Sequence, residues 1–169
     1  SIGVRVFGDG EIRNYGDVDA SGFALVLRDG DGIIYNAGTA QAQTAAYLGG
    51  STAEEGANRL INTGVLSGDD YGVYATSESA VVINSGTISS ADKNLATIRM
   101  IDFAGTESFL LNNAGTVMSA GRAFSGGNSV DTILNTGLIT GQMTMNEGDD
   151  IYRGQDGEIV GDIYGGDGN

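Results

Sequence analysis

Paired carboxylates in glycine-rich segments are the residues of this chain whose type and spacing could support chemistry. The pairs are Asp69 with Asp70 and Asp149 with Asp150. Such pairs bind calcium, or act as acids on a polysaccharide when a lysine or arginine lies beside them. Acids in glycine-rich turns are usually solvated, and the arginines of this chain form no single column. A polysaccharide lyase or epimerase is therefore an alternative hypothesis and not the leading one.

The composition excludes several classes of function. The chain has no histidine and no cysteine, which excludes the usual zinc sites, cysteine nucleophiles and histidine-based triads. Acidic residues number 22 against 8 basic ones, giving a net charge of −14. Such a surface repels nucleic acid and anionic membranes, and it suits an extracellular protein or one that collects cations. No apolar run is long enough for membrane insertion.

The C-terminal residues carry the strongest metal signal. Residues 165–169 read Gly-Gly-Asp-Gly-Asn, which matches the first half of the calcium-binding nonapeptide Gly-Gly-x-Gly-x-Asp-x-aliphatic-x. Gly165, Asp167 and Asn169 are therefore candidate calcium ligands, and residues 161–169 form the start of such a repeat. The copy stops before the aspartate of the pattern, so it does not close a site by itself. Folding is expected to require no cofactor, and Ca²⁺ is the one ion indicated.

A repeated motif indicates how these residues are positioned. The motif is asparagine, any residue, glycine, any residue and an aliphatic residue. Its asparagines are Asn14, Asn36, Asn62, Asn84, Asn113 and Asn135. They follow one another after 22, 26, 22, 29 and 22 residues. A period of this length is typical of a solenoid, in which each repeat stacks on the next.

Apolar residues recur at three fixed distances from the asparagine. Two residues before it stand Ile12, Ile34, Leu60, Val82, Leu111 and Ile133. Four residues after it stand Val18, Ala40, Leu66, Ile88, Val117 and Ile139. Eleven residues after it stand Leu25, Tyr47, Val73, Leu95 and Phe124. Side chains alternate between the two faces of a strand, so each set predicts an inward-facing column and a short strand.

These columns predict an all-β fold, a parallel β-helix (solenoid) with about seven turns of roughly 22 residues and three short strands per turn. Residues 1–169 are expected to form a single rod that is a segment of a longer protein. A helical solenoid is the competing architecture. It is disfavoured because the periodic segments are short, rich in β-branched residues and interrupted by glycine.

The asparagine and glycine of the motif have expected structural roles. Alternation points the asparagine inward, where its amide can bond the backbone and the asparagine one turn away. We therefore expect the six asparagines to form a structural ladder and not a ligand site. The glycine two residues later is expected to turn the corner in a left-handed conformation.

The two longest steps contain insertions at the same corner of the predicted rod. They run from Gly49 to Arg59 and from Thr97 to Ser108. Loops on one side of a rigid scaffold often bind partners, and insertions at an exposed corner are also tolerated without a function. The candidate partner-binding residues are Glu54, Glu55, Arg59, Arg99, Met100 and Phe103.

The motif turns also resemble a known group of proteins. Residues 62–74 and 84–88 are similar to passenger repeats of secreted bacterial right-handed parallel β-helix proteins, such as autotransporters and filamentous-haemagglutinin-like adhesins. The tail resembles the entry to a repeats-in-toxin (RTX) calcium-binding region. The resemblance implies an extracellular or cell-surface bacterial protein. It does not imply one activity, because such rods carry several.

The leading expectation is a non-enzymatic structural or adhesive segment of a larger secreted protein. Both ends of the repeat array look uncapped, so we expect association end to end or with flanking domains of the same protein. A surface glycan or matrix component is a further candidate partner. Besides the lyase or epimerase, the alternative is a calcium-binding repeats-in-toxin module.

Overall fold

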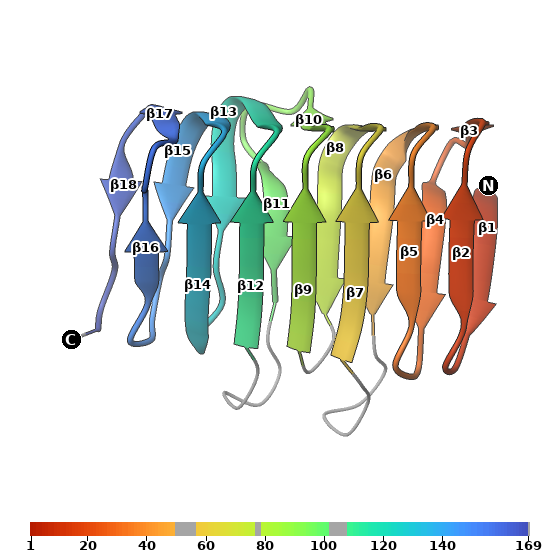
Figure 1. The fold of residues 1–169 in the computed structure, drawn as a ribbon, viewed down its shortest axis with the longest axis horizontal. Coiled ribbons are helices and arrows are strands. Elements are labelled where there is room, and N and C mark those ends of the chain that lie inside the picture. The colour runs from red at the N-terminus through yellow and green to blue at the C-terminus, as the bar shows by residue number, and fades with distance from the viewer. Residues whose placement is uncertain (50–56, 77–78, 102–107, 169) are drawn as a thin grey trace.

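The chain forms a parallel β-solenoid. The computed structural model describes residues 1–49, 57–76, 79–101 and 108–168. In these ranges all regular structure is strand, and the paired strands are parallel. Figure 1 shows the strands stacked side by side along the long axis, from β1 at one end to β18 at the other. The predicted all-β parallel solenoid with stacked turns of about 22 residues is confirmed.

One sheet takes one strand from each of seven turns. Its strands are β2 (Glu11–Asn14), β5 (Ile33–Asn36), β7 (Ala57–Asn62), β9 (Ser79–Asn84), β12 (Ser108–Asn113), β14 (Val130–Asn135) and β16 (Ile151–Arg153). Their spatial order follows the sequence order. The first six end at the repeat asparagine, which fixes their register: each asparagine is paired with the next one.

The second sheet forms the other side of the rod. Its strands are β1 (Ile2–Phe7), β3 (Asp17–Asp19), β4 (Phe23–Arg28), β6 (Thr39–Gly49), β8 (Val65–Thr76), β10 (Thr87–Ser90), β11 (Ala96–Met100), β13 (Thr116–Ser125), β15 (Leu138–Thr144), β17 (Glu158–Val160) and β18 (Ile163–Tyr164). Three turns therefore contain three short strands, as predicted. In the other four, the second and third strands join into one longer strand: β6, β8, β13 or β15.

The interior follows the first two predicted columns closely. Their residues are buried, apart from the half-buried Val18. The third column differs at two positions. Ala46 and Ile98 occupy the inward places, and Tyr47 and Leu95 are only half-buried. The cause is variable spacing after the second column, where the strand register shifts between Ala42 and Thr44 and five residues separate β10 from β11.

The corner glycines have a different role from the one predicted. Among the described glycines with φ in the left-handed region, none belongs to the motif. A Cβ added at Gly64 would instead collide with the carbonyl oxygen of Gly38 one turn away. That oxygen accepts a hydrogen bond from the Val65 amide at 2.9 Å. Glycine is therefore required because neighbouring turns stack too closely at this corner for any side chain.

Candidate functional site: an aromatic and arginine face

The side chains of the repeat asparagines form hydrogen bonds with one another and with the backbone. In each of five successive pairs, the amide nitrogen of one asparagine donates to the side-chain oxygen of the next at 2.8 Å. The same nitrogen also bonds backbone, as Asn36 does with the carbonyls of Gly38 at 3.2 Å and Val65 at 3.1 Å. All six side chains are buried. Their polar groups therefore stabilise the corner and do not face a ligand.

The candidate loop residues divide into three groups. Glu54, Glu55 and Phe103 lie outside the described residues. Arg59 and Arg99 lie on strands β7 and β11 and not in loops, the first exposed and the second half-buried.

Met100 ends β11 with 3% of its surface exposed, and it packs in the hydrophobic core. Its position therefore differs from the expected loop contact. The strands that precede both insertions, β6 and β11, end at the same edge of the rod (Figure 1).

The C-terminal motif lies on the last turn. Gly165 and Asp167 are exposed, and Asn169 is outside the described residues. The Asp167 amide donates to the carbonyl of Asn146 at 2.9 Å, in a parallel bridge between Glu147 and Asp167. The described residues contain no group of three or more acidic, histidine or cysteine side chains placed to hold a metal.

One carboxylate of each acidic pair accepts a hydrogen bond from the neighbouring turn. Asp70 accepts a hydrogen bond from the side-chain amide of Gln43 at 2.8 Å. Asp150 accepts one from the backbone amide of Asp131 at 2.8 Å. Burial is the main cause that raises the pKa of Asp150, and the charge of Asp149 adds to it. The two pairs lie in separate turns, so they do not combine into one acidic site.

The most distinctive exposed feature is a row of side chains that the sequence analysis missed. The register aligns Arg5, Val26, Tyr47, Tyr74 and Arg99 on five successive strands of the second sheet. Phe23 and Tyr71 flank this row, and Arg28 lies at the end of β4. We call the set formed by Arg5, Phe23, Arg28, Tyr47, Tyr71, Tyr74 and Arg99 the aromatic face.

The rings of the aromatic face pack on one another from turn to turn. Tyr47 and Tyr74 are stacked, with centroids 5.8 Å apart and an angle of 23° between their planes. Phe23 meets Tyr47 edge-on at 5.6 Å, and Tyr71 contacts Tyr74 at 4.9 Å. Burial is the main cause that raises the pKa of Tyr74, and the charge of Arg99 acts against it.

Two contacts hold the Tyr47 ring in place. Its hydroxyl forms a 2.9 Å hydrogen bond with the hydroxyl of Thr76. The ring also lies against Gly49, where an added Cβ would collide with it. These contacts hold the ring in one orientation.

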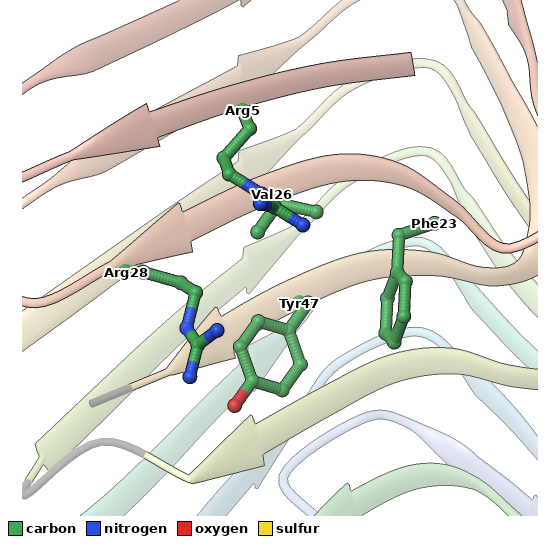
Figure 2. Close-up of a pocket in the computed structure, with 5 residues that line it drawn as sticks. All are labelled: Arg5, Phe23, Val26, Arg28 and Tyr47. Atoms are coloured by element: carbon green, nitrogen blue, oxygen red, sulfur yellow. The ribbon is translucent and has the colours of Figure 1, made fainter. Parts of the chain in front are cut away.

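A small hollow opens within the aromatic face (Figure 2). It has a volume of about 150 Å³ and is lined by Arg5, Phe23, Val26, Arg28 and Tyr47. Figure 2 shows the ring of Tyr47 between the Arg28 guanidinium on one side and Phe23 on the other. Val26 on β4 is 2% exposed and is aligned with Arg5 on β1 and Tyr47 on β6.

Among the described residues, the arginines of the hollow have no carboxylate partner. In the described part of the chain the sole ion pair joins Arg13 to Glu11, on the opposite sheet. The Nε atom of Arg28 is buried and has no hydrogen-bond acceptor. Arg5 lies over the ring of Phe7, with 5.5 Å between the guanidinium carbon and the ring centroid. Within the described part of the chain, the hollow therefore presents positive charge without an ion-pair partner, although the chain has a net charge of −14.

No protein-family model, curated protein or solved structure matches this chain. The fold therefore defines the class, a parallel β-solenoid. Among the described residues there is no helix of sufficient length and apolarity to cross a membrane.

Proposed function

We propose that this chain is a structural and adhesive segment of a secreted or cell-surface bacterial protein, and that the aromatic face contacts its partner. The observation that supports this proposal most strongly is the stack of Tyr47 on Tyr74 beside arginines that form no ion pair with any described residue. Tyrosine and arginine are enriched where proteins contact ligands, since each offers a large contact area with polar groups.

The solenoid supplies the rigidity that an adhesive surface needs. β4, β6 and β8 are each paired on both sides, so their backbones are fixed by ladders of hydrogen bonds. The asparagine ladder and the buried core fix the turns against one another. A face that is ordered before binding loses less entropy on contact, and this favours affinity.

The resemblance of the motif turns to autotransporter and filamentous-haemagglutinin-like passenger repeats supports the extracellular setting. The acidic composition is consistent with it. In this proposal the chain is one length of a longer rod, and its activity is binding. A surface glycan or a matrix component is the partner class.

A binding screen tests the proposal. The chain is immobilised and exposed to a panel of glycans and matrix proteins, together with a variant carrying Tyr47→Ala and Tyr74→Ala. The control is Tyr35→Ala, which removes a half-buried tyrosine from β5 on the opposite sheet. We expect the double variant to lose binding and the control to retain it. Equal binding by all three chains would contradict the proposal.

We also propose that this chain by itself associates end to end with a second copy, and that in the longer rod flanking segments cover the same ends. Val4 aligns with the core residue Leu25, and Ile163 aligns with the core residue Met143. Both Val4 and Ile163 are exposed, so the apolar interior reaches the surface at each end. A head-to-tail contact would pair the parallel edge strands and cover both sites.

Light scattering over a wide concentration range tests this association. We expect the mean mass to rise with concentration, and we expect Val4→Lys with Ile163→Lys to keep the chain monomeric. Circular dichroism controls for folding of the double variant. A wild-type chain that is monomeric at every concentration would contradict end-to-end association.

A further inference from the structure

We infer that the hollow of the aromatic face binds the acidic sugar unit of a polysaccharide. The sugar ring lies against Tyr47 and Phe23, and its carboxylate or sulfate lies between the guanidinium groups of Arg5 and Arg28. This inference rests on the proposed function, because it names the ligand class of the same surface.

The two arginines of the hollow favour an anionic ligand. Arg5 and Arg28 both line the hollow, and neither takes part in an ion pair among the described residues. The buried Nε of Arg28 lacks an acceptor, and an unpaired buried donor is unfavourable. A carboxylate or sulfate offers two oxygens that a guanidinium can bind with two parallel hydrogen bonds.

The arrangement of the Tyr47 and Phe23 rings favours a ligand group with a flat, partly apolar side. Tyr47 is held by Thr76 on one side and meets Phe23 edge-on at an angle of 73°. Together the rings form a corner beside Val26. The hollow of about 150 Å³ is smaller than the roughly 300–1,000 Å³ of pockets that enclose a drug-sized ligand. It therefore suits one sugar unit, with the rest of the polymer lying outside.

The solenoid period favours a linear polymer. Tyr74 and Arg99 follow Tyr47 in the same row, one and two strands further along. Successive strands lie about 4.8 Å apart. A linear polysaccharide advances by a similar step per sugar unit. Sugars that follow the one in the hollow would thus meet the Tyr74 ring and then the Arg99 guanidinium.

A peptide fits this surface less well. Peptides commonly dock by adding a strand to an open sheet edge, where backbone groups are free. β4 and β6, which carry Phe23, Arg28 and Tyr47, are paired on both sides and offer no free edge; among the strands that line the hollow, only β1, which carries Arg5, has an unpaired side. Recognition here must come from rings and guanidinium groups, which suits an acidic sugar chain.

Calorimetric titration with three hexasaccharides tests the inference. The probes are an oligogalacturonate, which carries carboxylates, a heparin-derived hexasaccharide, which carries sulfates, and the neutral cellohexaose. We expect one or both acidic probes to bind and the neutral one not to bind. Binding should weaken between low and physiological salt because the contact is ionic. The stronger of the two acidic probes identifies the anionic group.

Variants assign the binding to the hollow. Arg28→Gln should weaken binding of the acidic probe about tenfold or more, because a charge-assisted contact is lost. Arg28→Lys keeps the charge without the planar fork and should give an intermediate affinity. Tyr47→Phe keeps the ring but loses the hydrogen bond to Thr76 that holds it, so it should weaken binding less than Tyr47→Ala does. The matched control is Arg59→Gln, an exposed arginine on the opposite sheet, which should leave the affinity within about twofold.

Three outcomes distinguish failure of this inference from failure of the proposed function. If a neutral glycan or a matrix protein binds in a manner sensitive to Tyr47→Ala while no acidic probe binds, the inference fails and the adhesive role stands. If acidic probes bind equally well to wild type and Arg28→Gln, the inference also fails. If substitutions in the aromatic face do not change the binding of any glycan or matrix protein, both the inference and the proposed function fail.

Discussion

Replacing Asn84 by alanine removes the middle of the asparagine ladder. Asn84 is fully buried, donates to Asn113 at 2.8 Å and to the carbonyl of Thr116 at 3.2 Å, and accepts from Asn62 at 2.8 Å. Each such bond contributes about 1 kcal/mol net, and the oxygen of Asn113 would be left buried without its donor. We expect the free energy of unfolding to fall by about 2–4 kcal/mol.

Two control variants test the reasoning behind that value. Asn14 lies at the first position of the ladder and donates to Asn36 and Thr39 without accepting from an earlier asparagine, so Asn14→Ala should cost about 1 kcal/mol. Thr63→Ala removes an exposed side chain whose only bond is long, 3.4 Å to the carbonyl of Asn36, and should cost less than about 0.5 kcal/mol.

Urea denaturation followed by circular dichroism measures all three variants. The expected order of destabilisation is Asn84→Ala, then Asn14→Ala, then Thr63→Ala. A loss for Asn84→Ala no larger than that for Thr63→Ala would refute the view that the ladder stabilises the corner.

Three further predictions concern other parts of the rod. Gly64→Ala should destabilise by about 1–3 kcal/mol in urea because its Cβ meets the Gly38 carbonyl, whereas Gly16→Ala, with open space around the Cβ, should change little. Burial raises the pKa of Asp150, so its contribution to stability is present below about pH 4 and is lost as the pH rises through the folded-state pKa. Asp150→Asn, which keeps the acceptor for Asp131, should therefore be slightly more stable than the wild type at pH 7, by less than about 0.5 kcal/mol because solvent screens this partly exposed group, and equally stable near pH 3, as thermal unfolding at both pH values will show. Calorimetry should detect no tight Ca²⁺ binding by this chain, and a chelator should not lower its Tm; stoichiometric tight binding would show that the acidic turns form sites.

The period and the first two core columns were predictable because the repeat asparagine anchors them. A short, constant distance separates Asn62 from Leu60 before it and Leu66 after it, and the same distances recur in the other turns. Strand alternation then determines which side chains face inward. Stacking of identical turns requires the register to repeat, so a sequence period translates directly into a structural one.

The third column was not fully predictable because its distance from the asparagine varies. The shift between Ala42 and Thr44 places Ala46 inside and turns Tyr47 outward. A change of one residue reverses the face of every following side chain. The aromatic face was missed for this reason: a fixed count of eleven residues assigned its central ring to the core.

The role of the corner glycines was also beyond the sequence. A glycine recurs at this position of the motif, and two causes explain a recurring glycine equally well. One is a left-handed turn, and the other is close stacking of neighbouring turns. Only the position of the Gly38 carbonyl against Gly64 distinguishes the two causes.

The most direct test of recognition by the aromatic face is a backbone NMR titration of the chain with an acidic hexasaccharide. The account predicts that perturbed amides cluster on β1, β4, β6 and β8 around Arg5, Arg28 and Tyr47, with no change on β5 or β9 of the opposite sheet. Perturbations confined to the opposite sheet or to the C-terminal turn would contradict it, as would saturable binding that leaves the amides around Tyr47 unchanged.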